Sequence, residues 1–277
     1  MPTSRVNGVG IRWEMSGEAG DPLVLVHGSW GDHNNWAAVA PMLSRSLRVL
    51  TYDRRGHSES ERVDGQGSVR DDVADLASLL EALEHRPAHV IGNSFGASIV
   101  LRLASERADL FSSLIVHEPP LFHLLKDEPD AQDALAVVQQ RIGTVASLLA
   151  AGDLAAGARQ FVETIAFGPG AWESLPAKAK ETFVFNAPTW LDEVRDPEAL
   201  TLDLSGLHAF SAPALLTMGD QSPPYFPLVV HRIARALPNA TVRSYAGAGH
   251  IPHLSHPGEY VRVVTDFIAK SAPSPAT

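Results

Sequence analysis

The stretch that decides the fold is Gly92-Asn93-Ser94-Phe95-Gly96, which matches the pattern Gly-x-Ser-x-Gly. The apolar run 88–91 before it predicts a short buried strand, and residues 97–104 after it predict a helix packed on a sheet. A serine on such a tight turn projects its Oγ out of the backbone, beside the first N–H groups of the helix. The stretch therefore predicts a nucleophile at Ser94. The alternative is a glycine-rich turn of any doubly wound sheet.

The composition is that of a globular protein with an acidic surface. Of 277 residues, 45% are hydrophobic, and 22 basic against 32 acidic residues leave a net charge of −10. This charge repels phosphate backbones and anionic lipids, so we expect no nucleic acid and no membrane partner. The absence of cysteine excludes disulfides and a cysteine nucleophile. Neither a secretory signal nor a bilayer-spanning run is recognisable, so a cytoplasmic protein is expected.

Predicted strands and helices alternate along most of the chain. Apolar runs and alternating patterns predict strands, and a period of about 3.6 residues predicts helices. We expect strands at 11–15, 23–26, 48–52, 88–91, 114–116, 214–218 and 241–245, and helices at 69–83, 95–106, 225–236 and 256–269. This order predicts an α/β protein, with a mostly parallel sheet and helices on both faces.

The pattern changes after Pro119-Pro120. No strand pattern is convincing from there to residue 207, and helices are predicted at 134–151, 154–166, 176–185 and 191–200. We interpret residues 121–207 as a helical cap inserted into a core formed by 1–120 and 208–277. The composition of residues 271–275 predicts a disordered tail.

A serine nucleophile needs a base, and His250 is the histidine placed to supply it. It follows the last predicted strand, in Ala246-Gly247-Ala248-Gly249-His250. Ligands of doubly wound sheets bind at the carboxyl ends of strands, and the glycines let this loop fold over that end. His253 and His256 follow at a spacing of three residues, which raises a metal site as an alternative. Because no cysteine or carboxylate accompanies them, we expect no metal.

The oxyanion formed during acyl transfer needs backbone donors. One is expected to be the N–H of Phe95, directly after the nucleophile. The other is expected from His27-Gly28-Ser29-Trp30, which follows the predicted strand 23–26, with the Ser29 N–H as the donor. Gly28 permits an unusual backbone turn there. The alternative is a plain strand-end turn in which His27 belongs to the core.

Several pieces in a consistent order resemble the α/β-hydrolase superfamily, and the resemblance covers roughly residues 5–270. The pieces are His27-Gly28, Asp53-Arg54-Arg55-Gly56-His57-Ser58, Gly92-x-Ser94-x-Gly96 and Gly247-x-Gly249-His250. The resemblance implies the α/β-hydrolase fold, an eight-stranded sheet with a helical cap in the insertion, and a serine hydrolase without a cofactor. It also implies that the segment like Asp53–Ser58 shapes the site, so Asp53 and Arg54 are expected to be structural.

The triad acid departs from the usual family pattern. That pattern is Gly-x-x-Asp after the next-to-last strand, and here Ser222 holds the expected position while Asp220 lies two residues early. Glu118 lies at the end of the strand that follows the nucleophile's helix. Some α/β-hydrolases, including fungal zearalenone lactonases, resemble this arrangement in taking their acid from that strand end. We therefore favour Glu118 as the acid, with Asp220 as the fallback and a structural ion pair of Glu118 as the alternative.

Aromatic residues in and near the insertion point to a hydrophobic pocket. Most of them are expected to form the core of the cap, and Trp30 and Trp190 are expected to contact substrate. No lysine or arginine is recognisably placed to bind a substrate carboxylate. The substrate is therefore expected to be a small hydrophobic ester or lactone. The oligomeric state is left open, a homodimer included.

The residues predict a cofactor-independent serine hydrolase that cleaves an ester or lactone through an acyl-enzyme on Ser94. Carbon–carbon hydrolysis, perhydrolysis and cofactor-free dioxygenation remain alternatives, because they occur on similar scaffolds with the same residues. A non-catalytic ligand receptor is a further alternative, suggested by the missing Gly-x-x-Asp acid.

Overall fold

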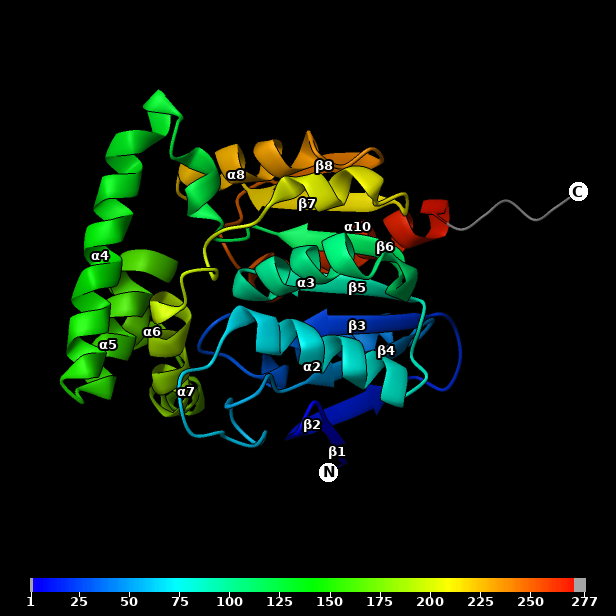
Figure 1. The fold of residues 1–277 in the computed structure, drawn as a ribbon, viewed down its shortest axis with the longest axis horizontal. Coiled ribbons are helices and arrows are strands. Elements are labelled where there is room, and N and C mark those ends of the chain that lie inside the picture. Colours follow the sequence, from blue (N-terminus) through cyan, green and yellow to red (C-terminus); the bar gives the residue numbers. More distant parts are fainter. Residues whose placement is uncertain (1, 272–277) are drawn as a thin grey trace, which may run out of the picture.

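A computed structural model describes residues 2–271. Eight strands in this range form one mixed sheet (Figure 1). The strands lie in the order β1-β2-β4-β3-β5-β6-β7-β8. Their bounds are β1 Thr3–Val6, β2 Val9–Ser16, β3 Pro22–Val26, β4 Arg48–Tyr52, β5 Ala88–Asn93, β6 Phe111–His117, β7 Ala214–Gly219 and β8 Ala240–Tyr245. β2 pairs antiparallel with β1 and β4, and the pairs from β4 to β8 are parallel. The predicted eight-stranded, mostly parallel sheet is confirmed.

Strand β1 is absent from the predicted strands, although Asn7-Gly8 marks it. The φ angles of Asn7 and Gly8 are 45° and 79°, in the left-handed region that a two-residue type I′ hairpin turn requires. Across this turn Val6 pairs with Val9. The signal was therefore the Asn-Gly dipeptide, not the pattern of apolar residues.

Each central strand sends alternate side chains into two apolar layers, one on each face of the sheet. On β3, Leu23 and Leu25 belong to one layer, whereas Val24 and Val26 belong to the other. The layer of Val24 is covered by α2 Val69–Ala82, α3 Phe95–Glu106 and α8 Tyr225–Ala234, and the opposite layer by α1 Ala40–Leu43 and α10 Pro257–Ser271. Helices thus cover both faces, as predicted.

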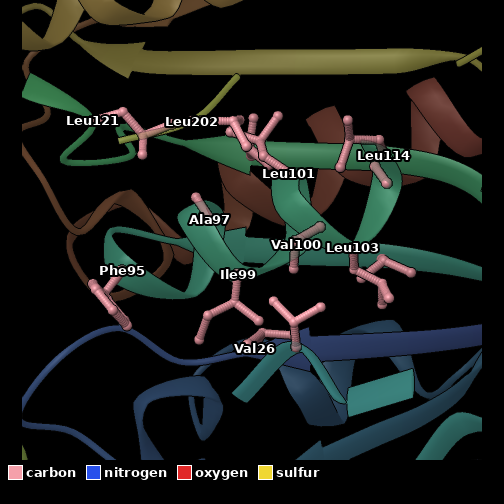
Figure 2. Packing of buried hydrophobic residues seen from close by; sticks show 14 of the residues in the cluster. Val26, Phe95, Ala97, Ile99, Val100, Leu101, Leu103, Leu114, Leu121 and Leu202 are labelled. Carbon is pink, nitrogen blue, oxygen red and sulfur yellow. The ribbon is translucent and has the colours of Figure 1, made fainter. Parts of the chain in front are cut away.

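Helix α3 is packed on all sides. Its residues from Phe95 to Ala104 are all buried. Figure 2 shows Ile99 on the side of the helix where Val26 lies, and Leu101 on the side of Leu114 from β6. Because a close-packed interior resists displacement, the first turn of α3 is fixed relative to the strand ends on both sides.

The chain between β6 and β7 is a helical insertion. Its main helices are α4 Gln132–Ala150, α5 Leu154–Phe161, α6 Ala171–Ser174 and α7 Ala177–Arg195, which Figure 1 shows together at one end of the sheet. The remaining helices are short: the 3-10 helices η1 His33–Trp36, η2 Ala108–Leu110, η3 Phe122–Leu125, η4 Pro129–Ala131 and η6 Leu204–Ala209, the π-helix η5 Val162–Ala166, and α9 Pro252–Ser255. The insertion has its own apolar cluster, but Phe122 and Leu202 near its ends belong to the main core.

The separation of the predicted helices 176–185 and 191–200 is wrong. One helix, α7, covers the first of these ranges from residue 177 and the second as far as Arg195, with Pro188 inside it, and residues 196–200 lie beyond its end. Proline lacks an N–H and usually ends a helix, which is why the sequence predicted a break there. Here the helix continues because residues on both sides of Pro188, among them Asn186 and Trp190, are anchored by burial.

Between residues 2 and 271, no helix combines the length and apolar character that crossing a bilayer requires. Of the predicted disordered stretch 271–275, only Ser271 lies within the described residues, as the last residue of α10.

Two glycines bring β3, β5 and α3 into close contact. A Cβ on Gly96 would lie 2.3 Å from the carbonyl oxygen of Val26, and a Cβ on Gly92 would lie 2.5 Å from the carbonyl oxygen of Gly96. Both obstacles are backbone atoms, which cannot rotate away as a side chain could. The turn around Ser94 therefore depends on the missing side chains.

We expect Gly96→Ala to lower the free energy of unfolding by about 1–3 kcal/mol, because the new methyl group overlaps the Val26 carbonyl. Gly143→Ala is the matched control. Gly143 lies inside α4 with open space where its Cβ would be, so alanine should raise stability by about 0.5–1 kcal/mol. Urea unfolding measures both changes. A Gly96→Ala protein as stable as the wild type would contradict the close approach.

Candidate active site

Ser94 lies on a strained turn between β5 and α3. Its φ and ψ angles are 55° and −125°, outside the regions that a side chain normally allows. Its N–H donates to the carbonyl oxygen of His117 at 2.9 Å, which ties the turn to the end of β6. Residues in such conformations typically cost about 1–3 kcal/mol and cluster at functional sites. The turn has the geometry that the sequence pattern predicted.

His250 and Glu118 meet beside this turn. Glu118 follows β6, and its Oε2 lies 2.7 Å from His250 Nδ1 in the loop after β8. The other carboxylate oxygen accepts the N–H of Gly219 at 2.7 Å. The ring of Phe226 stacks on the imidazole at a centroid distance of 4.7 Å. The imidazole is therefore fixed from two sides, with Nδ1 turned to a carboxylate.

The charge of Glu118 follows from its surroundings. Burial raises the pKa of this fully buried carboxyl, but the hydrogen bond from His250 and the charges of His117 and His250 more than offset the effect, and the pKa is lowered to about 2. The pKa of neighbouring His117 is lowered to about 4, chiefly by burial. Glu118 is thus ionised at neutral pH, so in the contact between them His250 Nδ1 is the donor and the Glu118 carboxylate is the acceptor.

The other candidate acid lies elsewhere. Asp220 has an exposed side chain, and its Oδ1 accepts the N–H of Gly247 at 2.8 Å. It therefore supports the loop before His250 without contacting the imidazole. Ser222, at the position where the family pattern expects the acid, has a buried hydroxyl that has no hydrogen-bond partner among the described residues.

The two expected oxyanion donors lie in the same place. Ser29 and Phe95 line one cavity together with Ser94 and His250. Within the described chain, neither the Ser29 N–H nor the Phe95 N–H has a hydrogen-bond partner. A Cβ on Gly28 would lie 2.9 Å from the Cβ of Ser94, so this loop rests directly against the turn.

The peptide group between Gly28 and Ser29 is oriented by contacts of its carbonyl oxygen. The Gly28 carbonyl oxygen lies 2.8 Å from His27 Nδ1 and accepts from Arg54 Nη1 at 3.4 Å. His27 Nε2 accepts the backbone N–H of Arg54 at 3.0 Å, so the proton of His27 is on Nδ1. Because the C=O and N–H of a trans peptide point in opposite directions, the Ser29 N–H points away from His27 and Arg54.

The Asp53–Ser58 segment supports this loop from behind. Asp53 is buried and accepts the N–H of His33 at 2.9 Å, and Arg54 is buried against Asp72 at 2.8 Å. Neither Asp53 nor Arg54 is among the residues that line the cavity. Their contacts are those expected of structural residues.

The cavity is mainly apolar and encloses about 560 Å³, including its open mouth. Its polar lining comes from Ser29, Ser94, Glu193 and His250. Its apolar lining comes from Phe95, Pro120, Phe122, Ile142, Phe161, Ile165, Ala166, Trp190, Val194, Leu200 and Phe226. Trp190 therefore lies where a substrate contact was expected. Glu193, on α7, was not singled out from the sequence, because an acidic residue on an amphipathic helix carries no local sign of burial.

The expected substrate contact of Trp30 is not supported. Its side chain is fully buried, stacks on Phe161 and Phe183 of the insertion, and lies at a tilt against Trp190. A ring with no exposed surface cannot touch a ligand in this conformation. Trp30 is next to Ser29 in the sequence, but its ring belongs to the apolar cluster of the insertion and not to the cavity lining.

Potential metal ligands converge at two places in residues 2–271. One group is His117, Glu118 and His250, and the other is Asp32, His33 and Asp53. The first is the candidate triad region, and the second lies within the hydrogen bonds that support the oxyanion loop. His253 and His256 belong to neither group.

A serine turn, a histidine and a carboxylate at neighbouring strand ends, beneath a helical insertion, characterise a known family. Residues 23–263 match the alpha/beta hydrolase family. The chain belongs to this family.

Individual relatives of this alpha/beta hydrolase are diverse. The 2-hydroxymuconate semialdehyde hydrolase of Pseudomonas sp. strain CF600 is 28% identical over 91% of this chain and 88% of its own length. Three other curated relatives match over only 30%, 46% and 33% of their own lengths. Alignments that short leave the activity of the whole chain open.

Solved structures support the same fold. An esterase from Thermogutta terrifontis has a TM-score of 0.77 and 21% identity, covering 98% of this chain and 99% of its own. An enol-lactonase from Burkholderia xenovorans LB400 has a TM-score of 0.65 and 23% identity, covering 97% of this chain and 100% of its own. At these identities the likeness establishes that the alpha/beta hydrolase shares their fold.

The lowered pKa of Glu118 predicts an acid-dependent contribution to stability. A carboxyl whose pKa falls from 4.5 to about 2 on folding stabilises the protein above pH 4.5, by roughly 3 kcal/mol. This contribution is lost as the pH falls from 4.5 towards 2. Denaturant unfolding of wild type and Glu118→Gln should therefore differ by a constant amount above pH 5 and converge below it. A difference that stays constant down to pH 3 would contradict an ionised, hydrogen-bonded Glu118.

Proposed function

We propose that this alpha/beta hydrolase is a cofactor-independent serine hydrolase that cleaves a carboxylic ester or lactone through an acyl-enzyme on Ser94. The observation that carries the proposal is the 2.7 Å contact between Glu118 and His250 Nδ1, beside a strained serine in the same cavity. That contact orients the free imidazole nitrogen for proton transfer from a serine hydroxyl.

In the proposed mechanism, Ser94 Oγ attacks the substrate carbonyl and His250 Nε2 takes the hydroxyl proton. The ionised Glu118 stabilises the resulting imidazolium. The N–H groups of Ser29 and Phe95 stabilise the tetrahedral oxyanion. His250 then gives its proton to the leaving alkoxide. A water activated by the same imidazole finally hydrolyses the acyl-enzyme and restores Ser94.

The cavity supports an uncharged, apolar substrate. No lysine or arginine is among the described residues that line it, and its one carboxyl, Glu193, offers an anion no positive charge. Burying a carboxylate without a cationic partner costs several kcal/mol. A substrate that carries a carboxylate, such as the 2-hydroxymuconate semialdehyde in the name of one relative, would therefore be disfavoured in this cavity.

The alternatives from the sequence use the same residues for different chemistry. Carbon–carbon hydrolysis, perhydrolysis and cofactor-free dioxygenation would leave Ser94, His250 and Glu118 in place, so product analysis distinguishes them. A ligand receptor would bind an ester without multiple turnovers. Haloalkane dehalogenase or epoxide hydrolase activity is disfavoured, because those enzymes usually use an aspartate nucleophile.

We expect wild type to hydrolyse short and medium-chain p-nitrophenyl esters and Ser94→Ala to lose this turnover. Glu118→Gln should lower kcat by about 10²–10⁴-fold, because a neutral amide cannot stabilise the imidazolium. Asp220→Asn is the matched control, and its kcat should fall by less than about tenfold, since asparagine can still accept the Gly247 N–H. Steady-state kinetics measure all three. The opposite ranking of Glu118→Gln and Asp220→Asn would make Asp220 the acid.

We expect strong discrimination against a charged acyl group. The hemisuccinate of p-nitrophenol should be turned over with a kcat/KM about 100-fold or more below that of its methyl ester, because each factor of ten corresponds to about 1.4 kcal/mol of burial cost. The methyl ester is the size-matched control. Equal turnover of the two would contradict an uncharged substrate and favour the carbon–carbon hydrolase alternative.

A further inference from the structure

One face of helix α7 contacts the loop that carries the Ser29 donor. Asn186, Trp190 and Glu193 are spaced by four and three residues, so they share one face of the helix. Asn186 Nδ2 donates to the carbonyl oxygens of Trp30 at 3.2 Å and Gly31 at 2.9 Å. The rings of Trp190 and Trp30 lie 5.4 Å apart. Two turns of α7 thus contact the loop that contains Ser29, Trp30 and Gly31.

Glu193 makes the contact nearest to the expected oxyanion hole. Its Oε2 accepts the hydroxyl of Ser29 at 2.5 Å, and its Oε1 accepts Arg54 Nη2 at 2.9 Å. The same guanidinium donates to the Gly28 carbonyl at 3.4 Å and lies 4.7 Å from the ring centroid of Phe95. Glu193 and Arg54 therefore touch both segments that carry the two oxyanion donors.

Stability alone is a poor explanation for a carboxyl in this place. The Glu193 side chain is only 8% exposed, and burial raises its pKa to about 7 while Arg54 acts in the opposite direction. Replacing a buried ion pair by apolar side chains of similar volume is often neutral or stabilising. The pair Arg54–Asp72, at 2.8 Å, already gives the guanidinium a partner. What Glu193 adds is a bond to Ser29.

We propose that Glu193 is a positioning residue of the oxyanion hole. Its carboxyl group holds the Ser29 side chain through one oxygen and, through Arg54, the carbonyl end of the 28–29 peptide, so the Ser29 N–H is held where the oxyanion forms. This proposal rests on the proposed function, since it needs an oxyanion at Ser94. It means that the geometry of the hole depends on a residue from the helical insertion.

The test compares Glu193→Ala, Glu193→Gln and Ser29→Ala with wild type on p-nitrophenyl butyrate. Glu193→Ala should lower kcat by about 10- to 100-fold, because a displaced donor stabilises the transition state less. KM should change by less than about threefold, since the ground-state carbonyl needs the donor less. Glu193→Gln keeps one acceptor oxygen and should fall between Glu193→Ala and wild type.

The inhibition constant of butylboronic acid distinguishes a positioning role of Glu193 from a role in stability alone. Ser94 Oγ adds to its boron, the hydroxyl proton passes to His250, and the boron becomes a tetrahedral anion that mimics the transition state. Glu193→Ala should raise the inhibition constant by about tenfold or more. In a Ser29→Ala background, the effect of Glu193→Ala on kcat should shrink by about threefold or more, because the two residues act through one hydrogen bond.

Asp192→Asn is the matched control, because Asp192 is the neighbouring acidic residue on α7 and lies beside Gly67, away from Ser29. It should keep wild-type kcat and boronic acid affinity. A Glu193→Ala protein with lowered Tm but wild-type kcat and boronic acid affinity would overturn the positioning role alone. A wild type with neither ester turnover nor boronic acid inhibition would overturn the proposed function, and the positioning role with it.

Discussion

The site depends on the close approach of backbone segments at the Ser94 turn. Gly96 lies against the end of β3, and Gly28, two residues beyond β3, lies against Ser94 itself. A side chain at either position would force apart the serine and the loop with the proposed second oxyanion donor, Ser29. Because neither glycine has a Cβ atom, the Ser94 turn and the loop at Gly28 can lie in direct contact.

The parallel sheet explains how a carboxylate can reach His250 from either of two strands. Asn93, His117 and Thr217 are successive partners across β5, β6 and β7, so the residues after β6 and β7 emerge side by side. An imidazole placed over these ends can be reached from both. Here Ser222 leaves the usual position without a carboxylate, and the longer side chain of Glu118 reaches His250 from the neighbouring strand. The departure from the family pattern is thus a small displacement in space.

The sequence could predict what local pattern and chain order encode. The sheet, the insertion and the placement of Ser94 and His250 after strands follow from apolar runs, glycines and loop order. A contact between Glu118 and His250 could be expected because Ser222 occupies the position of the usual acid. The contacts of Glu193 with Ser29, across 164 residues, could not be predicted. They depend on how the insertion docks, and neither residue carries a local sign of that docking. For the same reason the sequence predicts that Trp30 contacts the substrate, whereas its ring packs in the apolar cluster of the insertion.

The burial of Trp30 has a consequence for how this chain could acquire a different insertion. Its indole belongs to the main domain in sequence, yet it is part of the apolar cluster of the insertion. The helices between β6 and β7 are thus not an independent module. A chimera that received them from a relative would carry a cluster lacking its central ring, unless residues 28–31 were transplanted as well. Inheritance of a new specificity would then require two distant segments of the gene to change in concert.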